Sequence, residues 1–134
     1  MENRSLDSII KKNLEQFPDV SMGILYGSAV TGKIKMDSDI DLAISGRKSL
    51  PKDILINIVE ILAKDLNRPI DIVDLKETNG TLLHQIITKG QLIYCTDRNL
   101  YAELIKKMLY NQVDMMPYHD RILKERREKW INES

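Results

Sequence analysis

Short apolar runs that alternate with amphipathic stripes constrain the fold of this chain more than any other feature. Met22 to Tyr26 and Ile40 to Ile44 are two such runs, and each is followed directly by a pair made of glycine and serine. Apolar segments of this length, bounded by turn residues, are typical of central β-strands. Pro69 to Leu75 and Gln91 to Cys95 follow the same pattern, so further strands are expected there.

The segments around these runs carry apolar residues at the spacing of an amphipathic helix. We expect a first helix that ends near Phe17, and a second with Pro51 near its start, since proline is favoured in the first helical turn. Gly90 closes a third helix, and Arg98 starts a helical region that is interrupted at Pro117. The order of elements predicts an α/β fold in which helices flank a small sheet.

The length and composition of the chain limit its organisation. With 134 residues, the sequence suits a single domain, in which we expect an α/β core at residues 1–96 and a helical C-terminal extension at residues 97–134. Lys and Arg number 20, as do Asp and Glu, which argues against a protein that binds nucleic acid through a basic surface.

Three further features bear on the compartment. The single cysteine, Cys95, excludes an intramolecular disulfide, and the sequence holds no apolar stretch of membrane-spanning or signal-peptide length. We therefore expect a cytoplasmic protein with no contact with a membrane.

Two aspartates at the start of a predicted strand are the first candidates for chemistry. Asp39 and Asp41 are two residues apart, so the alternation of side chains along a strand places them on one face, opposite Ile40. Adjacent carboxylates repel each other unless a cation lies between them, and oxygen ligands of this kind suit Mg²⁺. Asp71, on a neighbouring predicted strand, is the candidate for a third ligand, whereas Asp74 falls on the opposite face.

Gly27 and Ser28 are the candidates for holding a phosphate. A glycine followed by a small hydroxyl residue, between a strand and a helix, lets backbone N–H groups approach an anion. Residues 29–38 are small, polar and basic, which predicts a short helix and a turn. Lys33 and Lys35 in this segment are candidates for contacting a triphosphate.

A Walker A phosphate loop is the rival interpretation of the same segment. Gly27 and the pair Gly32-Lys33 have its spacing, but Ile34 stands where that loop needs Ser or Thr to bind Mg²⁺. The segment that follows is also too short for the helix that a Walker A loop precedes. We therefore reject this interpretation.

Gly27-Ser28, followed after ten residues by Asp39-x-Asp41, resembles the signature of the DNA polymerase beta-like nucleotidyltransferases. The motif's position, the strand at residues 70–73 and the C-terminal segment at residues 116–123 are similar to the smallest branch, the MNT proteins paired with HEPN-domain toxins. The resemblance spans nearly the whole chain. It implies the small mixed β-sheet of the nucleotidyltransferase type.

The resemblance also implies an activity and the residues that perform it. Asp39, Asp41 and Asp71 would be the catalytic, Mg²⁺-binding residues, and Gly27, Ser28 and Lys33 would bind the nucleotide. The expected reaction moves AMP from ATP to a tyrosine of a cognate HEPN ribonuclease toxin, for which the chain would be the antitoxin. Two alternatives stay open: a small-molecule acceptor such as an antibiotic, and an antitoxin that binds its partner without catalysis.

Overall fold

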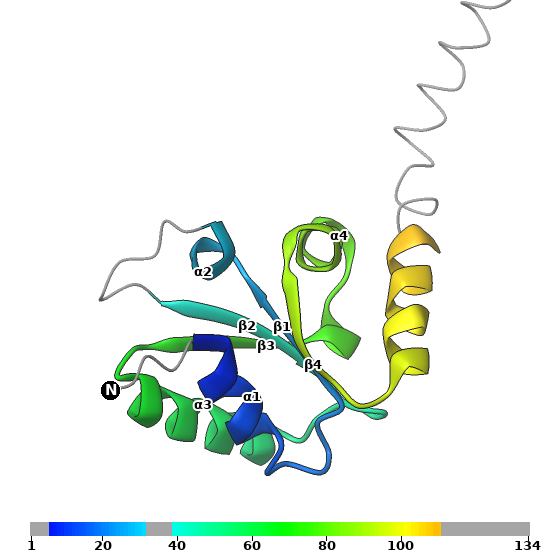
Figure 1. The fold of residues 1–134 in the computed structure, drawn as a ribbon. Coiled ribbons are helices and arrows are strands. Elements are labelled where there is room, and N and C mark those ends of the chain that lie inside the picture. Colours follow the sequence, from blue (N-terminus) through cyan, green and yellow to red (C-terminus); the bar gives the residue numbers. More distant parts are fainter. Residues whose placement is uncertain (1–5, 32–38, 111–134) are drawn as a thin grey trace, which may run out of the picture.

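The computed structural model of the protein describes residues 6–31 and 39–110 (Figure 1). Each strand predicted from the sequence is present, and no end of a strand differs from its predicted position by more than one residue. A helix also covers residues 98–110. The remaining elements, in chain order, are α1 (Leu6–Leu14), β1 (Met22–Tyr26), α2 (Ser28–Thr31), β2 (Ile40–Ser45), α3 (Lys52–Leu66), β3 (Ile70–Asp74), the 3-10 helix η1 (Leu75–Glu77), α4 (Gly80–Lys89) and β4 (Gln91–Cys95).

The four strands form one mixed sheet in the order β3-β2-β1-β4. β1 pairs antiparallel with both β2 and β4, whereas β2 and β3 run parallel. α1 and α3 cover one face of the sheet, and α4 and the helix at residues 98–110 lie on the other (Figure 1). This arrangement confirms the predicted α/β class and the mixed sheet.

The sheet separates two hydrophobic cores because alternate residues of each strand point to opposite faces. On β2, Leu42 and Ile44 belong to the first core, under α1 and α3, with neither side chain exposed. Ala43, between them, belongs to the second core. Residues Leu104 and Met108 of the last described helix complete that second core against α4. Both faces of the central strands are therefore buried, as their apolar sequences predicted.

The Asp74 carboxylate is not available for chemistry, because backbone N–H groups bind both of its oxygens. The side chain is buried, and its two oxygens accept hydrogen bonds from the backbone N–H groups of Leu50, at 2.8 Å, and Lys76, at 3.0 Å. These bonds connect the segment before α3 to the end of β3. They also give a hydrogen-bond acceptor to two backbone N–H groups that would otherwise lack one. The sequence analysis favoured Asp71 over Asp74 as a metal ligand, and in the structure Asp74 has a structural role.

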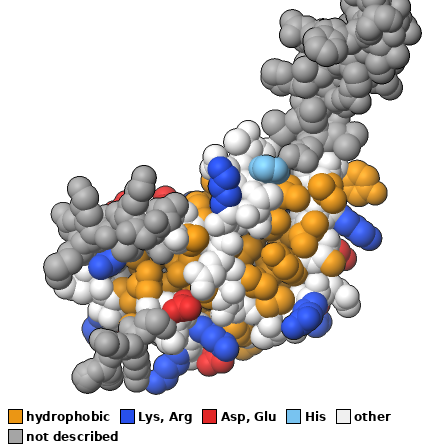
Figure 2. Space-filling view, turned by 45° about the horizontal axis from the view of Figure 1, so that its top comes forward, with side chains coloured by type: hydrophobic (Ala, Val, Ile, Leu, Met, Phe, Trp, Pro, Cys, Tyr) orange, Lys and Arg blue, Asp and Glu red, His pale blue; other side chains and the backbone are white. Residues whose placement is uncertain are grey.

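Apolar side chains also reach the surface beside α4 and the helix at residues 98–110. Leu82 is 39% exposed, Leu109 50% and Tyr110 67%. Figure 2 shows hydrophobic side chains gathered on both sides of α4 on this face of the molecule. Within residues 6–31 and 39–110, no helix is long and apolar enough to cross a lipid bilayer.

Candidate active site

Three polar side chains line up across three adjacent strands at one end of the sheet. Tyr26 lies opposite Asp41 in the β1–β2 pair, and Asp41 lies opposite Asp71 in the β2–β3 pair. Directly opposed residues point to the same face of a sheet, so these side chains form a row on the face of the second core. The register of the strands thereby places Asp71 next to Asp41, as the sequence predicted.

The carboxylate of Asp41 is influenced by the neighbouring carboxylate of Asp71. Partial burial raises the pKa of Asp41 first, followed by the negative charges of Asp71 and Asp39 and by a side-chain hydrogen bond with Asp71. Such a shift means that the ionised pair is unfavourable without a positive charge nearby. A divalent cation between the two carboxylates removes this repulsion, so the donor set fits Mg²⁺.

Asp39 stands somewhat apart from this pair. It immediately precedes β2, its side chain is exposed, and its charge acts on Asp41 more weakly than that of Asp71 does. Among the residues that the structure describes, no three His, Cys, Asp or Glu side chains are grouped closely enough to hold a metal ion. The Asp41–Asp71 pair is therefore the geometric centre of the candidate site, and the metal-binding roles of all three aspartates stay predictions.

Gly27 forms the tight turn between β1 and α2, directly against the carboxylate of Asp41. Its φ angle of 72° lies in the left-handed region, which favours glycine. A Cβ atom at this position would overlap Asp41 Oδ2. The direction of the chain therefore favours glycine, and a side chain here would displace the Asp41 carboxylate. This contact joins the two halves of the sequence motif in space.

Ser28 opens α2, a single turn in which the Val30 N–H donates to the Gly27 carbonyl at 3.1 Å. The turn lies beside Asp41. If the aspartate pair binds a cation, a phosphate bound to that cation would lie next to this turn. Phosphate binding by Gly27 and Ser28 stays a prediction. Lys33 and Lys35 lie outside the described residues.

Tyr26 is the member of the row that sequence reasoning missed. Burial, followed by the negative charges of Asp41 and Asp71, raises its pKa to about 12. In the sequence it is merely the last apolar residue of a strand, because strand pairing is needed to bring it opposite Asp41. Its position directly before the Gly27-Ser28 turn was the available signal.

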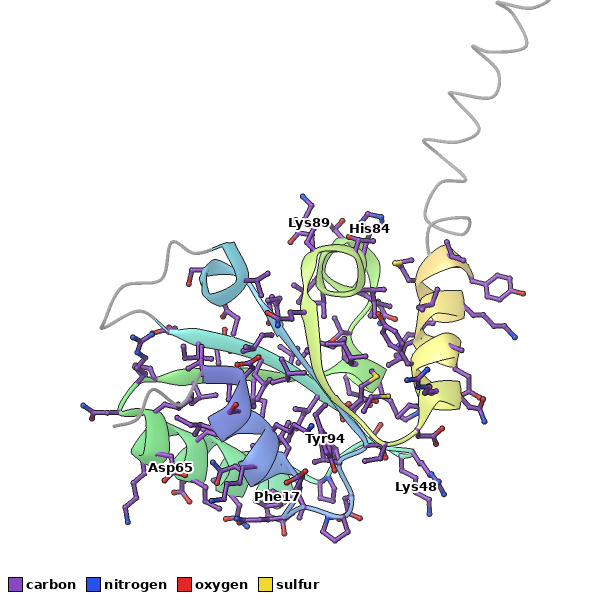
Figure 3. The ribbon with its side chains drawn as sticks, viewed as in Figure 1. Phe17, Lys48, Asp65, His84, Lys89 and Tyr94 are labelled. Atoms are coloured by element: carbon purple, nitrogen blue, oxygen red, sulfur yellow. The ribbon has the colours of Figure 1, made fainter. Side chains whose placement is uncertain are left out.

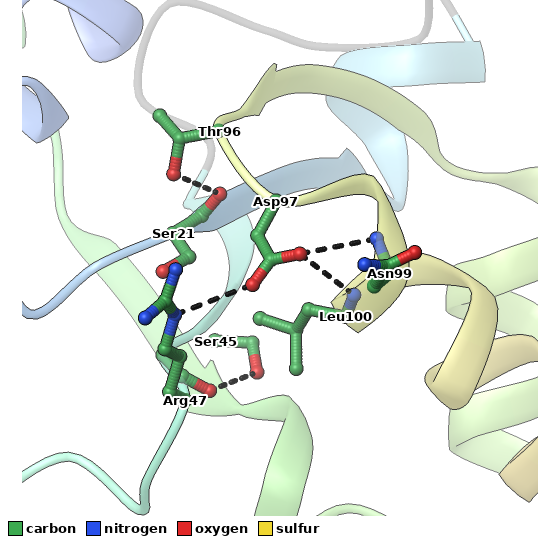
Figure 4. A network of polar contacts seen from close by, with 8 residues as sticks. Ser21, Ser45, Arg47, Thr96, Asp97, Asn99 and Leu100 are labelled. Atoms are coloured by element: carbon green, nitrogen blue, oxygen red, sulfur yellow. Dashed lines mark hydrogen bonds and ion pairs between the residues drawn. The ribbon is translucent and has the colours of Figure 1, made fainter.

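The opposite end of the sheet holds a cavity of about 480 Å³, lined by Ser21, Arg47 and Thr96 among others. Figure 4 shows the polar contacts beside it, in which Arg47 Nε donates to Asp97 Oδ2 at 3.3 Å. The other oxygen of Asp97 accepts the N–H groups at the start of the helix at residues 98–110. This network anchors a helix, and the cavity is remote from the aspartate pair.

The surface around α4 carries His84 and Lys89, which point away from the sheet (Figure 3). Lys48 and Tyr94, by contrast, lie at the end of the sheet where β1 begins (Figure 3). His84 is half-buried on α4. His119 lies outside the described residues.

Known proteins resemble this chain in sequence and in fold. Residues 8–99 match the family described as "Polymerase beta, Nucleotidyltransferase". The protein adenylyltransferase MntA of Shewanella oneidensis is 29% identical over 104 residues, which cover 76% of this chain and 75% of that protein.

Two solved structures are similar in fold. A chain in the crystal structure of a toxin-antitoxin with AMP-PNP has a TM-score of 0.72 and 23% identity, covering 91% of this chain and 98% of that one. A chain in the structure of tri-AMPylated Shewanella oneidensis HEPN toxin in complex with MNT antitoxin has a TM-score of 0.68 and 21% identity, covering 90% and 94%. Because the family match spans well over half of the sequence and includes the whole sheet, the chain belongs to the polymerase beta family of nucleotidyltransferases.

Proposed function

We propose that this nucleotidyltransferase transfers AMP from ATP to a tyrosine hydroxyl of a cognate HEPN-domain ribonuclease toxin, in a reaction that requires Mg²⁺, and thereby acts as the antitoxin. The observation that carries the proposal is the coupled pair of Asp41 and Asp71 beside the Gly27 turn. A carboxylate pair next to a glycine-serine turn suits a metal-assisted phosphoryl reaction.

The relatives support the protein acceptor. The similar protein MntA is a protein adenylyltransferase, and one structural neighbour contains a HEPN toxin that is tri-AMPylated and bound to its MNT antitoxin. Another contains AMP-PNP, an ATP analogue. These descriptions concern those proteins, and they make AMP the group to test first and a HEPN toxin the acceptor to test first.

In the proposed mechanism, the acceptor hydroxyl attacks the α-phosphorus of ATP in line with the departing pyrophosphate. Asp39 and Asp41 would hold Mg²⁺, which when bound would supply positive charge to the attacking and leaving oxygens. Asp71 adds its carboxylate and takes up the proton of the acceptor. Gly27 and Ser28 fix the β- and γ-phosphates, so the chain contributes mainly position and charge.

The test combines the purified chain, ATP, Mg²⁺ and the proposed cognate HEPN toxin, with the toxin's mass measured before and after. We expect mass increases in whole AMP units on a tyrosine, and no increase with the double variant Asp39→Asn, Asp41→Asn. That variant should keep the circular dichroism spectrum of the wild type. Transfer that persists in a folded double variant would refute the assignment of the site.

The same experiment separates the alternatives. A toxin that is inhibited but unchanged in mass indicates an antitoxin that works by binding alone. AMP transfer to an aminoglycoside or another small hydroxyl compound, with the toxin unmodified, indicates a small-molecule acceptor.

A further inference from the structure

We infer that the outer edge of β4 binds a second copy of this chain, so that two copies join their sheets through antiparallel β4 strands related by a two-fold axis. The inference concerns the edge of the sheet opposite β3, which carries Asp71. It goes beyond the proposed function and does not depend on it.

β4 is an edge strand without charged residues. In the part of the chain that the structure describes, β4 pairs with β1 on one side and with no strand on the other. Its sequence, from Gln91 to Cys95, also contains no proline, and Leu92 is 38% exposed. Charged residues and prolines are among the features that keep an edge strand from pairing with another chain. β3, at the other edge, carries Asp71 and Asp74, so β4 is the edge better suited to accept a strand.

The backbone of β4 by itself offers only a short ladder of hydrogen bonds. The strand has five residues, and its register against β1 shifts once, between Gly23 and Ile24. A two-fold contact along this edge therefore needs support from side chains beside the strand. α1, which contacts β4 and covers one face of the sheet, provides them (Figure 1).

The groove between α1 and β4 carries two opposite charges. Lys11 and Glu15 line this groove of about 350 Å³ together with residues 92–96. Both residues are exposed, and they are about one helical turn apart. Burial, followed by the charge of Glu15, raises the pKa of Tyr94. Because α1 leads toward the start of β1, which pairs with Cys95, Glu15 lies toward the end of β4 and Lys11 toward its start.

A two-fold axis through the middle of β4 makes these charges complementary. It reverses the direction of both β4 and α1 in the second copy, so Lys11 approaches the partner's Glu15, and Glu15 approaches the partner's Lys11. The same axis places Leu92 beside the partner's Tyr94, an aliphatic side chain against an aromatic one. In such a contact both copies use the same patch of surface. The charge pattern thus favours a second copy over an unrelated strand.

Reversal of the two charges tests the inference. The dissociation constant is measured by analytical ultracentrifugation of the full chain, as the conversion of the 15.5 kDa chain to a species of twice that mass. Lys11→Glu and Glu15→Lys each place like charges across the axis, so each should weaken the dimer about 10-fold or more. The double variant Lys11→Glu, Glu15→Lys restores opposite charges and should regain the affinity of the wild type.

Two further variants complete the set. Lys64→Glu is the matched control, because it makes the same change of charge at an exposed position on α3, the helix that contacts β3. It should leave the dimer unchanged. Leu92→Lys adds a charge to the edge strand itself and should weaken the dimer. Circular dichroism of each variant checks that the chain is folded.

Three outcomes would overturn the inference. The first is a wild-type chain that sediments as a monomer at every concentration, even if the edge accepts a strand of another protein. The second is a dimer whose affinity is unchanged in Lys11→Glu, Glu15→Lys and Leu92→Lys, because another surface would then hold the copies together. The third is a double variant that dimerises as weakly as the single ones. AMP transfer plays no part in these measurements, so their failure leaves the proposed function standing.

Discussion

At the scale of single residues, Asp41 is suited to the proposed chemistry of the site but lowers the stability of the fold when it is ionised. Its alternation with Ile40 and Leu42 directs it to the face that carries Tyr26 and Asp71. There its pKa is raised, so the ionised form is less favourable in the folded chain than in the unfolded one. A residue chosen only for stability would not be ionisable at this position.

The raised pKa of Asp41 predicts how stability depends on pH. An acid whose pKa rises on folding stabilises the fold below its ordinary value of 3.8, and this contribution is lost as the pH rises through the folded pKa. Metal-free Asp41→Asn should therefore unfold at a higher temperature than the wild type at pH 7, and the difference should shrink toward pH 3. Because solvent screens this partly buried group, the gain is small.

Thermal unfolding in EDTA, followed by circular dichroism across this pH range, measures the effect. The addition of Mg²⁺ should stabilise the wild type and leave Asp41→Asn unchanged, because a ligand stabilises only the state that binds it. A metal-free Asp41→Asn less stable than the wild type at pH 7 would contradict the repulsion that we describe.

At the scale of elements, the turn between β1 and α2 joins the two halves of the motif. The sequence separates Gly27-Ser28 from the aspartates by ten residues, and the antiparallel pairing of β1 with β2 brings Gly27 into contact with Asp41. The ten intervening residues connect two antiparallel strands, and this pairing brings the two halves of the motif together. Glycine suits the left-handed backbone at this position, and a larger residue would push the Asp41 carboxylate out of its place.

Gly27→Ala should reduce AMP transfer by about 100-fold or more, because a displaced carboxylate misplaces the reacting groups. The left-handed backbone adds a cost to folding of about 1–3 kcal/mol. Both effects are measured on one preparation, by labelled transfer and by urea unfolding. Gly80→Ala is the matched control, since Gly80 has a similar φ of 65° but begins α4.

The two variants distinguish the cost of the left-handed backbone from the effect of displacing the Asp41 carboxylate. Gly80→Ala should lose stability to a similar extent and keep its transfer rate in the folded protein. An active Gly27→Ala would show that Asp41 tolerates the intrusion and that the close contact is not needed.

At the scale of the whole molecule, the helix at residues 98–110 is part of the folded unit. Leu104 and Met108 are 4% and 7% exposed and pack with α4 and the sheet in the second core. The sequence divided the chain into a core at residues 1–96 and an extension at residues 97–134, and that division stays a prediction. The packing indicates that the first turns of the extension stabilise the core.

Leu104→Ala should lower the free energy of unfolding by about 2–5 kcal/mol, through lost burial and the cavity that remains. Leu109→Ala, on the same helix with a side chain that is 50% exposed, should cost much less. Urea unfolding monitored by circular dichroism should show one transition for both variants. A Leu104→Ala variant as stable as Leu109→Ala would show that the helix is a separate appendage.

The sequence by itself determined the elements and the face that each strand residue occupies, because helical spacing and strand alternation depend only on local backbone geometry. It therefore identified β1 to β4, the helices and the opposed faces of Asp41 and Leu42. Which strands become neighbours depends on the packing of segments distant in the sequence. Only the tertiary structure decided that Tyr26 joins the row of Asp41 and Asp71, that Gly27 touches Asp41, and that Asp74 is consumed by backbone donors.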